Sequence, residues 1–143
     1  MPREVGREIA QKCKDIGFFA PNLSTEVGGG GLNCLEFTLL ERELGRASMA
    51  LSVFFGRPSG ILEACEGEQR EKYLYPVVTG EKIDALAMTE PGAGSDVRGM
   101  RCTAVADGDD WVINGTKHFI SHADLADFVI VFVATGEEES TRG

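Results

Sequence analysis

The hydrophobic period changes near Asp84, and this change constrains the fold more than any other feature of the 143 residues. Before it, apolar residues recur three or four positions apart, which predicts amphipathic helices. After it, they alternate in short runs with period two, which predicts β-strands. We therefore expect an α+β protein, with an all-helical N-terminal domain in residues 1–82 and an antiparallel β-barrel or sandwich domain in residues 83–143. The few strands would leave an open edge, so the β domain is expected to be truncated.

The first half contains clear helix signals. Gly17 predicts the end of a helix, and the glycine run 28–31 predicts a loop. Asn33, with Glu36 three residues later, predicts the capping box of a second helix. The first helix is predicted from an apolar stripe at steps of four, four and three: Val5, Ile9, Cys13 and Ile16.

Two further helices are predicted before the change of period. One is a buried helix in residues 48–55, and the other is a surface helix in residues 68–75 that ends or kinks at Pro76.

The Asn114–Gly115 pair predicts a tight hairpin turn, and the final apolar run predicts a strand that is buried on both faces. The predicted strands are 84–88, 102–106, 111–113, 117–121 and 128–134.

Charge and cysteine content exclude several classes of function. The net charge is −9, and residues 83–143 hold 11 acidic and 4 basic residues, a net charge of −7. Nucleic-acid binding is therefore not expected. The longest uncharged apolar run, 128–134, is too short to span a bilayer. The four cysteines include no CxxC pair, which favours a reducing compartment. His118 and His122 would lie roughly 13 Å apart on a strand, so no metal site is predicted.

The most informative run follows a predicted strand and reads AMTEPGAGSD, residues 87–96. Its two glycines allow close approach of a ligand, Thr89 and Ser95 supply hydroxyls, and consecutive amides in such a loop can bind phosphate. A plain turn between two strands explains the same residues equally well. The run is neither a P-loop nor a dinucleotide-binding fingerprint.

The same run, extended to AMTEPGAGSDVRG, resembles the first signature of the acyl-CoA dehydrogenase family. The run NGTKHFIS, residues 114–121, resembles that family's second flavin-contacting strand. Residues 17–21, 28–31 and 41–45 are similar to its helical N-terminal domain. The resemblance covers nearly the whole chain, and the order and spacing of both motifs agree with the family.

The resemblance implies FAD as cofactor. The Leu86–Thr89 backbone and the Thr89 hydroxyl would meet the pyrimidine end of the flavin. Gly94 and Ser95 would hold the pyrophosphate, with Ser95 also near the acyl-CoA substrate. Phe119 would pack against the ring system and Ser121 would lie near N5. The full set of implied FAD contacts is Leu86, Ala87, Met88, Thr89, Gly94, Ser95, Phe119, Ile120 and Ser121.

Four positions depart from the family pattern. Phe119 stands where Trp is common and Ser121 where Thr is common, and both replacements still stack or donate. Leu86 replaces a common Tyr or Phe, and His122 replaces Asn. The family's catalytic glutamate lies in a C-terminal helical domain, which we expect to lie outside this sequence, as does the first helix of the N-terminal domain. No catalytic residue is therefore assigned, and Glu90 is interpreted as structural.

The resemblance implies a fragment of a flavin-dependent dehydrogenase that converts acyl-CoA to trans-2-enoyl-CoA in fatty acid β-oxidation. Its expected partners are the acyl-CoA substrate, electron-transferring flavoprotein and further copies of itself, as a homodimer or homotetramer. The expected compartment is the bacterial cytoplasm or the mitochondrial matrix. Two alternatives stay open: an acyl-CoA oxidase or nitroalkane-oxidase-like flavoenzyme, and a non-catalytic module that binds flavin or acyl-CoA.

Overall fold

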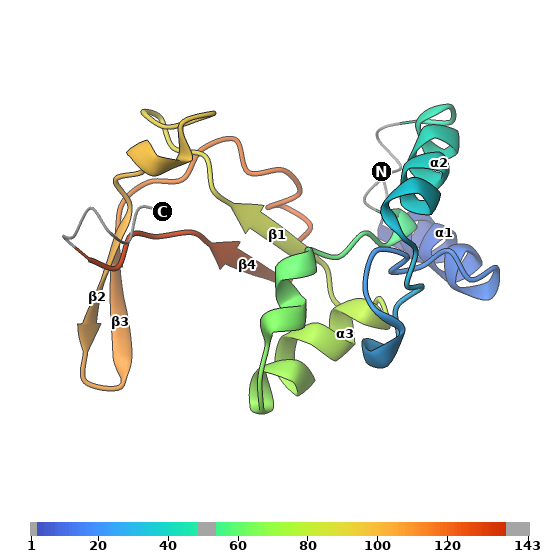
Figure 1. Ribbon diagram of the computed structural model, residues 1–143, viewed down its shortest axis with the longest axis horizontal. Coiled ribbons are helices and arrows are strands. Elements are labelled where there is room, and N and C mark those ends of the chain that lie inside the picture. The colour runs from blue at the N-terminus through green and yellow to red at the C-terminus, as the bar shows by residue number, and fades with distance from the viewer. Residues whose placement is uncertain (1–2, 49–53, 137–143) are drawn as a thin grey trace. The chain divides into compact units, whose positions relative to one another are not determined.

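The computed structural model describes residues 3–48 and 54–136 (Figure 1). Backbone contacts divide the chain into two compact units, Met1–Asp84 and Ala85–Gly143. No helix within the described residues is long and apolar enough to cross a membrane. The first unit contains α1 (Arg3–Asp15), η1 (Thr25–Val27), α2 (Cys34–Gly45), η3 (Gly60–Ala64), η4 (Arg70–Leu74) and α3 (Tyr75–Val78). The second contains η5 (Val97–Gly99), β2 (Thr103–Asp107), β3 (Asp110–Asn114), β4 (Phe128–Val131) and most of β1 (Asp84–Ala87).

The predicted ends of the first two helices are confirmed. The C-terminus of α1 is closed by two backbone bonds, from Gly17 to the Lys14 carbonyl at 3.0 Å and from Phe18 to the Cys13 carbonyl at 2.8 Å. At the start of α2, the Asn33 side chain accepts from the Leu35 and Glu36 amides. The Glu36 carboxylate accepts from the Asn33 amide in return, which completes the capping box.

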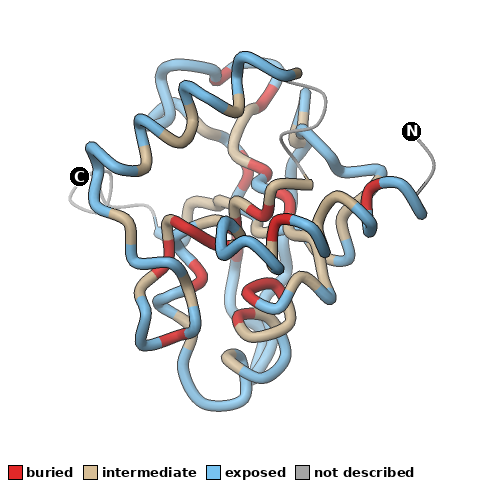
Figure 2. The backbone as a smooth tube through the Cα atoms, turned by 90° about the vertical axis from the view of Figure 1, so that its right-hand side faces the viewer, coloured by how far each residue is buried: buried red, intermediate tan, exposed pale blue. Residues whose placement is uncertain are grey.

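The glycine loop of the first unit folds back on the segment before it. The Gly30 amide donates to the Ala20 carbonyl at 2.9 Å, and the Gly31 amide donates to the Leu23 carbonyl at 2.8 Å. A Cβ on Gly29 would lie 2.4 Å from the Leu23 carbonyl oxygen, so only glycine permits this approach. Buried residues occur in short runs along the backbone (Figure 2). The most buried apolar residues of this unit are Ala20, Leu23, Leu62, Leu74 and Val77.

The helix predicted to end or kink at Pro76 does not end there but changes its helical type just before it. The chain passes from the π-helical turn η4 into α3, which runs to Val78. Proline has no N–H, so it cannot bond the Lys72 carbonyl as a helical residue would. The Lys82 ammonium donates to that carbonyl instead, at 2.9 Å. The helix predicted in residues 48–55 lies largely outside the described residues.

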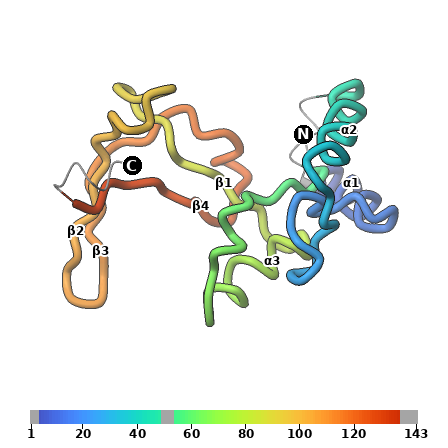
Figure 3. Tube along the Cα trace, in the orientation of Figure 1, coloured from blue at the N-terminus to red at the C-terminus, as the bar shows by residue number. Residues whose placement is uncertain are grey.

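The strands form two separate two-stranded sheets, β1–β4 and β2–β3 (Figure 3). The β2–β3 hairpin is antiparallel, pairs Thr103 with Asn114 and Asp107 with Asp110, and turns at residues 108–109, between the strands predicted in residues 102–106 and 111–113. A parallel bridge joins Thr103 to Ala134. The order of a helical part followed by a β part is confirmed, and within the described residues the strands do not close a barrel.

Three predictions about the β half are wrong. Residues 117–121 are irregular and do not form a strand, and Asn114–Gly115 does not make a hairpin turn. A Cβ on Gly115 would lie 2.7 Å from the Cys102 Cα, so this glycine serves close packing against Cys102. The last strand is shorter than predicted, and Val129 and Val131 are exposed, so β4 is not buried on both faces.

Candidate functional site

Two sequence motifs that are far apart in the chain meet in the second unit. The His118 amide donates to the Thr89 carbonyl at 2.8 Å. One residue earlier, the Lys117 ammonium donates to the Met88 carbonyl at 3.0 Å. These two bonds join the stretch before the glycine loop to the start of the second motif.

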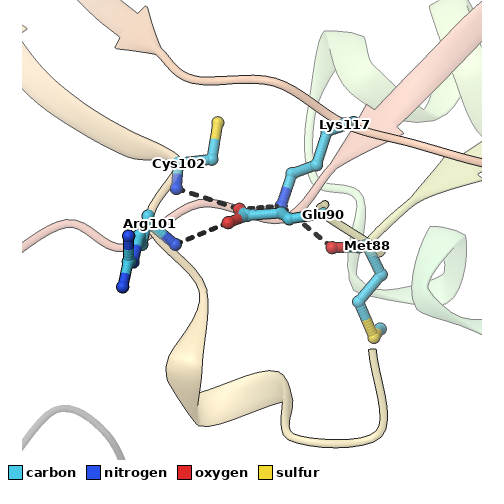
Figure 4. Close-up of polar contacts among 5 residues, drawn as sticks. All are labelled: Met88, Glu90, Arg101, Cys102 and Lys117. Carbon is cyan, nitrogen blue, oxygen red and sulfur yellow. Dashed lines mark hydrogen bonds and ion pairs between the residues drawn. The ribbon is translucent and has the colours of Figure 1, made fainter. Parts of the chain in front are cut away.

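A buried carboxylate lies at the centre of this junction, and we call its surroundings the Glu90 cluster: Met88, Glu90, Arg101, Cys102 and Lys117 (Figure 4). Glu90 Oε1 accepts from Lys117 Nζ at 2.8 Å and from the Cys102 amide at 2.9 Å. Its Oε2 accepts from the Arg101 amide at 2.6 Å. The side chains of Glu90 and Lys117 are 5% and 10% exposed. Both oxygens of a nearly fully buried carboxylate are therefore satisfied.

This environment holds the Glu90 side chain ionised. The hydrogen bond from Lys117, then the Arg101 and Cys102 amides and the ammonium charge, lower the pKa of Glu90 from 4.5 to about 2, although burial opposes the shift. A carboxyl group with such a pKa is a poor base near neutral pH. The structure therefore supports the interpretation of Glu90 as structural.

The backbone of residues 87–89, at the start of the first motif, has its carbonyls hydrogen-bonded within the protein and some amides free. The carbonyls of Ala87, Met88 and Thr89 accept from Phe132, Lys117 and His118, respectively. The amides of Met88 and Thr89 donate to no other group in the part of the chain that the structure describes. This short segment therefore presents free hydrogen-bond donors to a ligand, whereas its carbonyl acceptors are already bonded within the protein.

The glycine loop offers donors of the same kind. Its base is closed by a bridge in which Glu90 and Ala93 exchange backbone bonds of 2.9 and 3.2 Å. Beyond it, Gly94 and Ser95 are exposed, and neither amide bonds another described residue. Free amides in a glycine loop suit phosphate oxygens, particularly in a unit with a large excess of acidic side chains.

The aromatic residue of the second motif projects into solvent. Phe119 is 81% exposed, and its backbone adopts a positive φ of 56°. Its ring stacks on His118 with a centroid distance of 3.6 Å and an interplanar angle of 21°. One face of the ring is thus supported by the protein, and this ring is open to a planar ligand. Ile120 is half-buried and Ser121 is exposed.

The structure brings some of the predicted site residues together and leaves others apart. Met88 and Thr89 are tied to the second motif, whereas no hydrogen bond among the described residues ties Gly94 or Ser95 to it. Leu86 is exposed and Ala87 is buried. The donors fit FAD, whose pyrimidine ring and pyrophosphate carry hydrogen-bond acceptors.

Sequence reasoning missed Lys117, the side chain that holds the two motifs together. One signal pointed to it: residues 83–143 contain only 4 basic residues against 11 acidic ones, and one of these bases lies inside the second motif. In a segment with so few bases, a lysine inside a motif is a candidate partner for a buried acid. The amides of Arg101 and Cys102 carried no such signal, because any residue type has a backbone amide.

Comparison with known proteins connects this geometry to a family. The sequence matches the N-terminal domain of acyl-CoA dehydrogenases over residues 1–81 and their middle domain over residues 85–143. It is 39% identical to the caffeyl-CoA reductase–Etf complex subunit CarC of Acetobacterium woodii, over 98% of this chain and 38% of that one. It is 33% identical to the mitochondrial short-chain specific acyl-CoA dehydrogenase of Bos taurus, over 93% of this chain and 34% of that one.

A solved structure agrees with both matches. The glutaryl-CoA dehydrogenase of Mycobacterium smegmatis, in complex with FADH2, superposes with a TM-score of 0.76 at 30% sequence identity, covering 96% of this chain and 36% of that one. The chain thus spans little more than a third of the length of the relatives that it matches. On the two domain matches and the shared fold, this chain belongs to the acyl-CoA dehydrogenase family.

Proposed function

We propose that this chain forms the FAD-binding part of an acyl-CoA dehydrogenase that oxidises acyl-CoA to trans-2-enoyl-CoA. The observation that carries the proposal is the set of free amide donors at Met88, Thr89, Gly94 and Ser95, which lies on the motif that the family resemblance assigns to the flavin. Family members with bound flavin, such as the FADH2 complex named above, support FAD as the cofactor.

Each part of the site has a separate task in this proposal. The backbone of Leu86–Thr89 and the Thr89 hydroxyl bind the pyrimidine end of the flavin, and Gly94 and Ser95 bind the pyrophosphate. Phe119, supported by His118, packs on the ring system, with Ile120 and Ser121 beside it. When bound, FAD supplies a hydride acceptor for carbon–carbon dehydrogenation. Donors near N1, O2 and N5 favour the reduced ring because they stabilise its added charge.

The proposed arrangement follows the two matched domains. Residues 1–82 would belong to the helical N-terminal domain, and residues 83–143 to the β middle domain. The α-proton would be removed by a glutamate in a further helical domain, as the family resemblance implies. Two of the relatives named above are dehydrogenases by name, which supports a dehydrogenase over an oxidase.

A second candidate is the reverse reaction, reduction of a 2-enoyl-CoA. The relative that is 39% identical is named a reductase subunit, and it is more similar to this chain than the dehydrogenase named beside it.

The same relative is named as part of a complex with Etf, which supports electron-transferring flavoprotein as the proposed redox partner. Assembly as a homodimer or homotetramer, and residence in the bacterial cytoplasm or mitochondrial matrix, complete the proposal.

Flavin binding is tested on the protein as its gene encodes it, by titrating apoprotein with FAD and following flavin fluorescence. Ser95→Ala should weaken FAD binding by about 1–3 kcal/mol, because a phosphate oxygen loses the hydroxyl that donates to it. Ser59→Ala is the matched control, since the Ser59 side chain makes no capping bond and lies in the other unit. If the wild-type protein binds no FAD, the proposed function is wrong.

Turnover separates the remaining candidates. Oxidation of acyl-CoA with a dye acceptor supports the dehydrogenase, and reduction of an enoyl-CoA by reduced electron-transferring flavoprotein supports the reductase. Oxygen uptake without another acceptor would instead indicate an oxidase. Residues 1–143 alone should bind FAD without turnover, because no residue in them is assigned as the base. Turnover by residues 1–143 alone would contradict this assignment.

A further inference from the structure

The buried Glu90–Lys117 ion pair also contacts the backbone of the first motif, at the Met88 carbonyl. A buried ion pair is weak evidence for stability, because the free energy needed to remove two charges from water offsets much of their attraction. The Lys117 ammonium donates one hydrogen bond to the Met88 carbonyl at 3.0 Å and a second to Glu90. The bond to the carbonyl fixes the orientation of a particular peptide group.

That peptide group carries the amide of Thr89. A trans peptide is planar, and its C=O and N–H point in opposite directions. No peptide bond in the described chain is cis. Because Lys117 holds the Met88 carbonyl on one side, the Thr89 N–H must face the other side, where it has no partner among described residues. The neighbouring peptide is fixed in its turn by the bond from His118 to the Thr89 carbonyl.

Glu90 holds Lys117 in place for this task. Its carboxylate is anchored by the Arg101 and Cys102 amides, so the ammonium meets a fixed counter-charge. Gly115 lies two residues before Lys117 and packs against Cys102, which brings the second motif next to that anchor. The cluster thus connects the backbone at residues 101–102, through Glu90 and Lys117, to the Met88 carbonyl (Figure 4).

We propose that Lys117, held by Glu90, is a positioning residue that directs the Thr89 amide toward the flavin. This inference rests on the proposed function of the same site. In this inference Lys117 does not contact the flavin itself. It sets the orientation of the Thr89 amide by holding the Met88–Thr89 peptide. Loss of the ammonium would let the Met88–Thr89 peptide rotate, so that the free energy of ordering it would oppose FAD binding.

The test uses the protein as its gene encodes it and compares Lys117→Met with wild type. We expect the dissociation constant for FAD to rise about tenfold, because one oriented donor is lost. The visible absorption spectrum of the bound flavin should also shift, because a hydrogen bond to the ring has changed. Lys82→Met is the matched control, because it too removes a lysine bond to a backbone carbonyl, at 2.9 Å and in the other unit. Its FAD affinity and flavin spectrum should equal those of wild type.

A double variant separates positioning from stability. Glu90→Gln combined with Lys117→Met removes both buried charges and should restore much of the thermal stability lost in Lys117→Met. If Lys117 positions the amide, FAD affinity stays reduced and the spectrum stays shifted in this folded protein. FAD binding as tight as in wild type, in either folded variant, overturns the inference. If wild type itself binds no FAD, the proposed function fails instead.

Discussion

Two lysine–glutamate ion pairs have the same N–O distance but differ in their exposure to solvent. Lys12–Glu8 on α1 and Lys117–Glu90 in the second unit both have an N–O distance of 2.8 Å. The side chains of the first pair are 71% and 66% exposed, and those of the second are 10% and 5% exposed. Water competes for the first pair and screens it, whereas the second pair is held by amides on one side and a carbonyl on the other. The comparison teaches that burial, and not distance, decides what an ion pair contributes.

The largest difference should appear when one lysine of each pair is removed. Lys117→Met leaves a buried carboxylate without its cation and should lower the free energy of unfolding by about 3 kcal/mol. Lys12→Met should leave it unchanged within error, because both members of that pair are exposed. Urea unfolding followed by circular dichroism measures both. Equal losses in the two variants would break the comparison.

Acid should reveal the same difference through the carboxylates. The pKa of Glu90 in the folded state is about 2, below its ordinary value of 4.5. The stabilisation that the ionised side chain provides is therefore complete above pH 4.5 and is lost as the pH falls toward 2. Glu90→Gln should remove this part of the acid dependence and lower stability at neutral pH.

Glu8 supplies the control for the acid experiment. Its pKa is also lowered, first by the hydrogen bond from Lys12, yet the group is exposed. Glu8→Gln should leave the stability at pH 7 and the acid transition as in wild type. Circular dichroism between pH 7 and pH 2 gives both curves. An acid transition that Glu8→Gln alters as much as Glu90→Gln would contradict the role given to burial.

A smaller effect should follow from crowding Cys102, whose amide donates to Glu90, without changing the charges of the buried pair. Gly115→Ala places a Cβ 2.7 Å from both Cα and Sγ of Cys102, at a backbone φ of 147°, and should cost about 2 kcal/mol. Gly60→Ala is the control, because a Cβ there meets nothing within 4 Å. Thermal unfolding of the two variants provides the measurement. No change in Gly115→Ala would show that the contact between Gly115 and Cys102 adapts freely.

Local chemistry made part of the fold predictable. The Asn33–Glu36 capping box, the end of α1 before Gly17 and the β2–β3 hairpin each depend on residues a few positions apart, so their sequence patterns are sufficient. The strand predicted in residues 117–121 failed for the opposite reason. That segment is shaped by bonds to Met88 and Thr89, almost thirty residues away, and such tertiary contacts override local propensity.

The sequence by itself determined the order of a helical part and a β part, the family, and the two motifs from which a flavin site is proposed. Only the tertiary structure decided that Lys117 of the second motif holds the Met88 carbonyl of the first, and that Glu90 is locked by two amides. The physical reason is range. Periodicity and turn chemistry act between near neighbours in the chain, whereas a buried hydrogen bond depends on which distant backbone groups the folded chain brings within about 3 Å.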